Sequence, residues 1–312
     1  MIQTYLFLLA GLLLLFVSGK YLVDSSVAIA KRFRIPSMII GLTVVAFGTS
    51  APELLVSIQA ALKGLPEIAM GNVVGSNISN ILLVLAITAL IFPIPVPKKS
   101  VRQDWPALML VSLLLFAFAW DGTLTRLEGL IFILILVVYL GIAVFQAKKH
   151  PVVQEKEADS EKQIKMWVAA LIFFASCAGL ALGANLLVEN AAIIAEGLGV
   201  SQRVISITMV AVGTSIPELA TSVIAALRKE TDIAIGNIIG SNIMNILSVL
   251  GVTSLIGNIT VDHAISHFDI PWMLGVTLLL LFMMMPAARA KIVRWEGALM
   301  IVVYLLYIYM IF

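Results

Sequence analysis

The sequence predicts an all-α polytopic membrane protein, with ten transmembrane helices in two inverted five-helix repeats and broken helices at the membrane midplane. Two observations predict this fold: a composition too apolar for a water-soluble domain, and a long segment that recurs 165 positions later. Of the 312 residues, 61% are hydrophobic and only 12% are charged, with a mean hydropathy of +1.07. Polar side chains are too few to cover a soluble globule of this size. We therefore expect the chain to be embedded in lipid.

Ten stretches have the length and composition of a membrane span, which takes roughly 17 to 25 apolar residues. The stretches 22–30 and 186–195 stay mostly apolar and are interpreted as continuations of the preceding helices. The only cysteine, Cys177, lies in an apolar stretch, so it is expected to pack as a small apolar side chain, and no internal disulfide is possible. The ten predicted spans are 3–19, 36–62, 67–92, 105–120, 127–146, 166–186, 203–227, 232–257, 268–287 and 293–312.

The distribution of Lys and Arg predicts the orientation. With ten spans, 17 of the 20 basic residues fall on one side of the membrane, and cytoplasmic loops carry the excess of basic residues. This bias places both termini outside the cell, in the plasma membrane. The predicted organisation is a first five-helix repeat (1–146), a polar cytoplasmic linker (147–165) and a second five-helix repeat (166–312).

An internal duplication is visible without gaps. Thr43–Leu85 aligns with Thr208–Leu250, and 26 of the 43 positions are identical. Two apolar helices share apolar residues by chance, so the polar matches are the informative ones. Gly-Thr-Ser-Ala-Pro-Glu, which ends at Glu53, recurs as Gly-Thr-Ser-Ile-Pro-Glu, which ends at Glu218. The repeated units cover about 39–85 and 204–250. Five spans precede the linker, so the second copy is predicted to be inverted, which is typical of secondary transporters with a midplane site.

The two repeated glutamates are the first candidate ligands. Glu53 lies about 15 to 22 Å from either end of its span at 1.5 Å per residue, and an ionisable group at that depth needs a partner. Glu218 repeats the situation, and neither residue has a Lys or Arg near mid-span. We expect a bound metal cation to supply the missing counter-charge.

The residues around the glutamates supply further oxygens. Pro52 and Pro217 break their helices, which frees backbone carbonyls at 46–49 and 211–214, and such irregular backbone is tolerated only where it is buried or lines a cavity. An all-oxygen set without Cys or His suits Ca2+ and Na+ and disfavours softer metals. The side-chain candidates are the hydroxyls of Thr49, Ser50, Thr214 and Ser215, and, on the third and eighth spans, Ser76, Asn77, Asn80, Ser241, Asn242 and Asn245.

Several features have simpler interpretations. A Pro-Glu pair can be only a helix kink with a buried protonated acid. Here the pair occurs twice, each time within the same polar motif, and this favours an ion-binding site. The Gly71-x-x-x-Gly75 pattern and its copy at 236–240 are interpreted mainly as close-packing surfaces. Asn72 and Asn237 are equally compatible with helix contacts and with ion binding. His263 and His267 are interpreted as solvated residues near an external loop rather than as an ion site.

The paired motifs resemble the two alpha-repeats of the cation/Ca2+ antiporter superfamily, in particular the prokaryotic Na+/Ca2+ exchangers. The resemblance implies alternating access, in which the first and sixth helices slide past a core that carries the ions. Transferred position by position, it also implies the ligands, with backbone carbonyls from the two alanines: Ala46, Thr49, Ser50, Glu53, Ser76 and Asn80, and Ala211, Thr214, Ser215, Glu218, Ser241 and Asn245.

One departure concerns Asn245, where some relatives have an aspartate; its neutrality favours Na+ over K+ coupling, and the Thr-Ser pair before Pro-Glu favours Na+ over H+. The predicted function is therefore Na+/Ca2+ exchange. H+- or K+-coupled exchange, a cation channel and a non-transporting scaffold are the alternatives. We expect no enzymatic activity and no cofactor. The expected partners are transported Ca2+ and Na+ and the lipid bilayer, without nucleic acid, and we expect a monomer.

Overall fold

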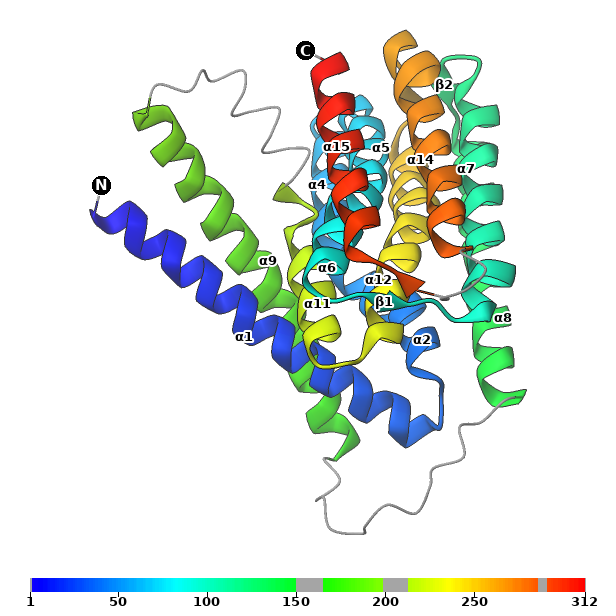
Figure 1. Cartoon of the computed structure of the whole chain (residues 1–312). Helices are drawn as coiled ribbons and strands as arrows, with labels where there is room; N and C mark the ends of the chain where they lie inside the picture. The colour runs from blue at the N-terminus through cyan, green and yellow to red at the C-terminus, as the bar shows by residue number, and fades with distance from the viewer. Residues whose placement is uncertain (1, 150–164, 199–212, 286–290, 312) are drawn as a thin grey trace.

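The computed structural model of the chain describes residues 2–149, 165–198, 213–285 and 291–311, and these are almost entirely helical (Figure 1). The first half, up to the linker, contains α1 (Ile2–Phe33), α2 (Ser37–Ile40), η1 (Gly41–Val45), α3 (Ala46–Thr49), α4 (Ala51–Leu62), α5 (Glu67–Ser79), η2 (Asn80–Leu85), α6 (Ala86–Ile91), β1 (Ile94–Pro95), η3 (Ser100–Asp104), α7 (Trp105–Ala119), β2 (Thr123–Leu124) and α8 (Arg126–Lys149). The second half contains α9 (Met166–Gly197), α11 (Ile216–Leu227), α12 (Thr231–Met244), η4 (Asn245–Leu250), α13 (Gly251–Ile256), β3 (Ile259–Thr260), η5 (Ile265–Asp269), α14 (Ile270–Met284), β4 (Lys291–Ile292) and α15 (Arg294–Ile311). The η elements are π-helical turns.

The helices match the predicted spans where the chain is described. Eight helices in the described ranges are long and apolar enough to cross a membrane, and the bent pair 37–49 and 51–62 makes a ninth if it is one span. The predicted span 203–227 begins outside the described residues, and its described part is the apolar helix α11. The expected continuations at 22–30 and 186–195 are confirmed, because α1 reaches Phe33 and α9 reaches Gly197. Such a set of helices fits a multi-pass membrane protein.

Short strands are the one departure from an all-helical chain. The four two-residue strands form two antiparallel pairs, β1 with β4 and β2 with β3, with Ile94 opposite Ile292 and Thr123 opposite Thr260. A strand of two residues is too short to show an alternation of polar and apolar side chains, so these strands were not predicted. The pairs join helix ends from the two halves of the chain.

The repetition extends beyond the aligned segment. The series α5, η2, α6, β1, η3 and α7 recurs as α12, η4, α13, β3, η5 and α14, and from η2 to α7 every boundary is shifted by 165 residues. Four of these elements, η2 and η3 with their copies η4 and η5, are π-helical turns, which are rare and are frequently found at functional sites. The duplicated sequence therefore folds into a duplicated backbone, including its irregular turns.

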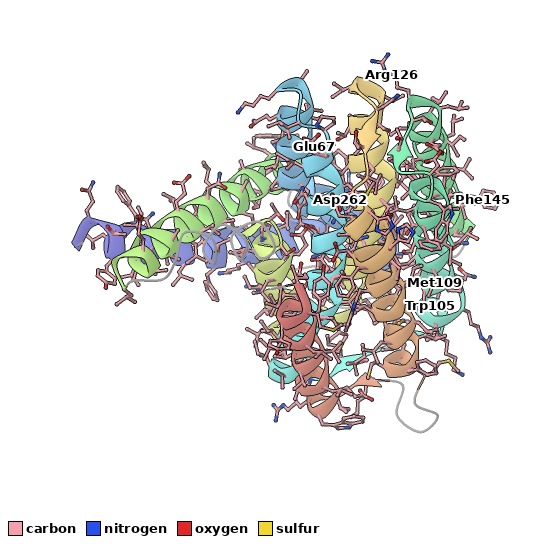
Figure 2. The ribbon with its side chains drawn as sticks, turned by 90° about the horizontal axis from the view of Figure 1, so that it is seen from above. Glu67, Trp105, Met109, Arg126, Phe145 and Asp262 are labelled. Atoms are coloured by element: carbon pink, nitrogen blue, oxygen red, sulfur yellow. The ribbon has the colours of Figure 1, made fainter. Side chains whose placement is uncertain are left out.

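Two long helices stand apart from the rest. α1 and α9 pack side by side along their length and extend obliquely away from the remaining helices (Figures 1 and 2). Their backbones nearly touch, since a Cβ on Gly11 would lie 2.8 Å from the Leu187 amide nitrogen and 2.9 Å from the Gly183 carbonyl oxygen. The pair meets the other helices mainly through contacts of α1 with α11.

The core centres on α12, which is buried on all sides. The hydrophobic window of this span is 100% buried inside the molecule. Its glycines allow the backbone of the first repeat to come close: a Cβ on Gly240 would lie 2.5 Å from the Leu42 carbonyl oxygen and 2.8 Å from Ala46 Cβ. The close-packing interpretation of the second Gly-x-x-x-Gly pattern is therefore confirmed, whereas that of the first is wrong within the described part of the chain, because nothing there lies within 4 Å of a Cβ added at Gly71 or Gly75.

We predict that Gly240→Ala destabilises the protein, because an added methyl group must displace the backbone of η1 or α3. Overpacking of this kind costs about 1–3 kcal/mol, seen as a drop of several degrees in the thermal midpoint of the detergent-solubilised protein. Gly275→Ala on α14 is the matched control, because nothing lies within 4 Å of an added Cβ there. An unchanged midpoint for Gly240→Ala would show that the contact is looser than the structure indicates.

Candidate cation site

The site is built on two broken helices. α3 ends at Thr49 and α4 begins at Ala51, with a bend of 41° between the two segments. Pro52 cannot donate a backbone hydrogen bond to the Gly48 carbonyl, and its ring disfavours a continuous helix there. In the second repeat, Ser215 has the same non-helical backbone angles as Ser50, and α11 starts directly after it. The predicted break is thus present at Pro52, and at Pro217 the described residues show α11 starting after a non-helical Ser215.

Each break places a glutamate in the first turn of a helix. Glu53 lies in the first turn of α4 and Glu218 in that of α11. The unpaired amides and the dipole at a helix N-terminus favour negative charge. Both side chains are fully buried, at 0% exposure, and the two carboxylates are close enough to interact electrostatically.

The carboxylates lack partners. Both Glu53 carboxylate oxygens and Glu218 Oε2 are buried without a hydrogen-bond donor. Among the described residues the ion pair is Arg228 with Asp24, so no basic side chain compensates either glutamate. Glu218 Oε1 accepts one hydrogen bond, from the Ser50 hydroxyl at 3.3 Å. Uncompensated buried charge is costly, and this deficit marks the place where a cation fits.

Hydroxyl groups connect the two repeats around the glutamates. Thr49 Oγ1 lies 3.2 Å from Ser241 Oγ, and the equivalent contact joins Ser76 Oγ and Thr214 Oγ1 at 3.1 Å. Each contact joins a broken helix of one repeat to the uninterrupted span of the other. The four hydroxyls therefore meet at the interface between the repeats, as the resemblance implied.

The amide positions are fixed in the same symmetric way. Asn80 Nδ2 donates to Asn242 Oδ1 at 3.0 Å, and Asn245 Nδ2 donates to Asn77 Oδ1 at 3.2 Å. Asn80 Oδ1 and Asn245 Oδ1 remain buried without a partner. Both residues start a π-helical turn, η2 and η4. Each amide nitrogen thus donates to the protein, which orients the amide so that its oxygen could accept a cation.

The predicted site residues can now be placed. Eleven of the twelve are described. Ala46 supplies a carbonyl at the break, which accepts from the Ser50 amide at 2.9 Å and from the Thr49 hydroxyl at 3.3 Å. Ala211 lies outside the described residues. The structure brings together the polar side chains of Thr49, Ser50, Glu53, Ser76, Asn80, Thr214, Ser215, Glu218, Ser241 and Asn245 through contacts with one another or with shared neighbours.

Other polar residues support this cluster. Asn72 donates to Ser57 at 3.2 Å, and Asn237 donates to Ser222 at 3.1 Å. Asn237 Oδ1 in turn accepts from Thr49 at 3.0 Å. These contacts favour the helix-contact interpretation of the two asparagines. The serines were not predicted, although their identity across the repeats, one turn after each glutamate, was an available signal.

The donor set is entirely oxygen. Carboxylate, hydroxyl, amide and carbonyl oxygens suit hard cations such as Ca2+ and Na+. Within the described ranges, no cluster of three or more His, Cys, Asp or Glu residues is arranged to hold a metal ion. His263 and His267 are exposed and stack with their ring centroids 3.8 Å apart, in agreement with solvated side chains. The free oxygens between the repeats are therefore the natural place for a transported cation.

Comparisons with known proteins agree with this geometry. The family model described as sodium/calcium exchanger protein matches residues 3–145 and 168–312. The putative antiporter CaxA of Alkalimonas amylolytica is 41% identical, covering 100% of this chain and 99% of that protein. The sodium/calcium exchanger MaX1 of Methanosarcina acetivorans is 33% identical, covering 99% and 98%.

A solved structure extends the likeness to the fold. The sodium-calcium exchanger NCX_Mj, soaked with 2.5 mM Na+ and 0.1 mM Ca2+, superposes with a TM-score of 0.83 at 32% identity, covering 99% of this chain and 98% of that one. The same exchanger soaked with zero Na+ and Ca2+ gives a TM-score of 0.84. The chain therefore belongs to the sodium/calcium exchanger family, and it is a multi-pass membrane protein of the cation/Ca2+ antiporter class.

Proposed function

We propose that this chain exchanges Na+ for Ca2+ across the plasma membrane, with Glu53 and Glu218 as the charged ligands of one shared site. The observation that carries the proposal is the set of buried, unpartnered oxygens on Glu53, Glu218, Asn80 and Asn245. Two carboxylates balance the charge of one Ca2+. The neutral hydroxyl, amide and carbonyl oxygens around them suit Na+, so the two ions compete for overlapping ligands.

The neutral ligands complete the proposed site. Thr49, Ser76, Thr214 and Ser241 form cross-repeat contacts, so an ion between the repeats would be within reach of hydroxyls from both. By the same symmetry, the carbonyl of Ala211 would match that of Ala46. Competition for these ligands couples the two opposite fluxes, since the site must be emptied of one ion to accept the other.

The arrangement of the helices supports alternating access. We propose ten spans in two inverted repeats, so that the unwound breaks come from opposite directions and meet at the midplane. α1 and α9 contact one another far more than they contact the other helices. They are therefore the elements that can move as a pair past the rest, which opens the site to one side at a time.

The charge bias supports an orientation. With both termini outside, the predicted linker 147–165 is cytoplasmic, as expected from the excess of Lys and Arg on that side. Exchange driven by the inward Na+ gradient would extrude Ca2+. The deciding experiment is 45Ca2+ uptake into proteoliposomes under an imposed outward Na+ gradient. Uptake that ignores the Na+ gradient and follows a pH gradient instead would establish H+ coupling.

We predict that Glu53→Gln and Glu218→Gln each reduce Na+-dependent 45Ca2+ flux at least about a hundredfold, equivalent to about 3 kcal/mol. Each change removes half of the charge that balances Ca2+ while preserving side-chain shape. Glu67→Gln is the matched control, because Glu67 is exposed at the start of α5. Undiminished flux in both site variants would show that the ion passes elsewhere.

We predict that Asn245→Asp makes transport pH-dependent between about pH 5 and 8, where the wild type is comparatively flat. An aspartate would face Asn77 Oδ1, which now accepts a hydrogen bond from Asn245 Nδ2. Two acceptors cannot bond unless the new carboxyl carries a proton, and a third carboxylate beside Glu53 and Glu218 further favours its protonation. The measurement is initial 45Ca2+ flux against pH. A flat profile in the variant would contradict this account of the amide network.

A further inference from the structure

The two halves of the site are not chemically equivalent, and the difference lies at residue 79. Ser79 on α5 corresponds to Met244 on α12 in the 165-residue register. Ser79 Oγ lies 2.9 Å from Ser215 Oγ, and both side chains are buried. In the first repeat, the equivalent serine, Ser50, instead donates to the Glu218 carboxylate at 3.3 Å. Met244 offers Ser50 no comparable hydrogen-bond partner.

The direction of the Ser79–Ser215 hydrogen bond follows from counting protons. Ser79 has one hydroxyl proton, and it donates this proton to the Ser76 carbonyl at 3.1 Å. Ser79 Oγ is then the acceptor in its contact with Ser215. The proton of Ser215 is therefore held on the protein, and the lone pairs of Ser215 are left for a cation. A hydroxyl that ligates a cation must direct its proton elsewhere, so Ser79 prepares Ser215 for that role.

Resting on the proposed function, we infer that Ser79 is a positioning residue that sets the affinity of the shared site for Na+ by orienting the Ser215 hydroxyl. The effect on Na+ should exceed the effect on Ca2+. Ca2+ is balanced by the two carboxylates, whereas each additional Na+ depends on neutral oxygens. Ser79 lies outside the ligand set that the repeats share, and the duplication alone does not reveal it.

The test compares Ser79→Ala with the hydroxyl-preserving Ser79→Thr. In Ser79→Ala, the half-saturating Na+ concentration should rise about threefold to tenfold, the worth of one buried hydrogen bond. The half-saturating Ca2+ concentration in Na+-free Ca2+/Ca2+ exchange should change less than about twofold. Ser79→Thr should restore the Na+ value. Equal changes for both ions, no change for Na+, or no rescue by threonine would overturn the inference.

A reciprocal variant and a binding measurement separate this inference from the proposed function. Met244→Ser would give Ser50 a hydroxyl acceptor in place of the Glu218 carboxylate and should lower the half-saturating Na+ concentration, with Met244→Ala as the control for lost volume. If wild-type flux lacks Na+ dependence, the proposed coupling fails. The role of Ser79 is then still tested by measuring how much Na+ displaces bound 45Ca2+ from the detergent-solubilised wild type, Ser79→Ala and Ser79→Thr proteins.

A second, independent asymmetry concerns the way α1 and α9 dock. The 165-residue register pairs Asp24 on α1 with Glu189 on α9, and Arg228 at the end of α11 with Lys63 at the end of α4. Arg228 forms an ion pair with Asp24. Lys63 and Glu189 are both exposed and are not paired with one another. One of two equivalent ion pairs is thus formed.

The helix surfaces next to these pairs show the same difference. On α11, Thr221 and Ile224 are buried at 0% and 6% exposure, and a Cβ on Gly19 of α1 would lie 2.5 Å from Ile224 Cδ1. On α4, the equivalent of Thr221 is Val56, at 43% exposure, and Leu55 beside it is 57% exposed. The α11 surface is covered by α1, while the matching α4 surface is open.

We propose that Glu189 and Lys63 form the second ion pair when α9 docks on the open surface of α4, as the Asp24–Arg228 pair separates. Each ion pair then stabilises one of the two end positions of the α1–α9 pair. The occupant of the α4 surface is α9 of the same chain, because the duplicated helix already occupies the equivalent surface. This rests on the proposed alternating access.

The test is disulfide cross-linking in a Cys177→Ser background, which removes the only native thiol. Lys63→Cys with Glu189→Cys should cross-link in reconstituted protein, and adding Asp24→Asn should raise the yield severalfold. Lys63→Cys with Glu196→Cys, about two helical turns further along α9, is the negative control. Absence of the 63–189 cross-link in Na+, in Ca2+ and without ions, or a yield unaffected by Asp24→Asn, would overturn it. Wild-type flux, measured in parallel, reports separately on the proposed function.

Discussion

The rest of the structure depends on two buried carboxylates that have no protein counter-charge. Glu53 and Glu218 lie at the centre of an apolar bundle, and three of their four oxygens lack a hydrogen-bond donor. In a protein without cargo such an arrangement would be costly and easily replaced by apolar packing. On the proposed function, the cost would be offset when a cation enters between the two carboxylates. The broken helices and the glycine contacts of α12 serve to bring these two groups together.

The duplicated architecture explains how one sequence motif makes a complete cage. The first helix of one repeat meets the uninterrupted span of the other, so several cross-repeat contacts occur twice, as Thr49 with Ser241 and Ser76 with Thr214. The paired amides of Asn77 and Asn242 lie at the same interface and fix the orientation of the neighbouring asparagines. Symmetry of this kind is what the proposed alternating access requires, because the site would then face either side with nearly the same ligands.

Much of the site could be predicted from the sequence because its residues violate the rules of an apolar helix. A glutamate directly after a proline in the middle of a membrane span indicates either a helix kink with a protonated acid or an ion site. Its recurrence in the second repeat favours the ion site. The residues of the candidate site could therefore be predicted, and so could the continuations of α1 and α9. The π-helical turns and the two-residue strands were not, because neither has a periodicity that a short apolar sequence reveals. Ser79 was missed for a different reason: it has no counterpart in the second repeat, and only contacts distinguish it from any other small helical residue.

The neutrality of Asn80 and Asn245 has a consequence for charge. With these two amides and two glutamates, the fixed charge of the site is −2. One Ca2+ neutralises it, and two Na+ neutralise it equally well. Exchange that moves net charge therefore requires the site to hold more Na+ than its carboxylates balance. The additional ion has only dipoles to stabilise it, namely oriented hydroxyls, amides and carbonyls. On the proposed Na+/Ca2+ exchange, the placement of protons on those neutral groups, rather than the number of acids, would then determine whether the transport cycle is electrogenic.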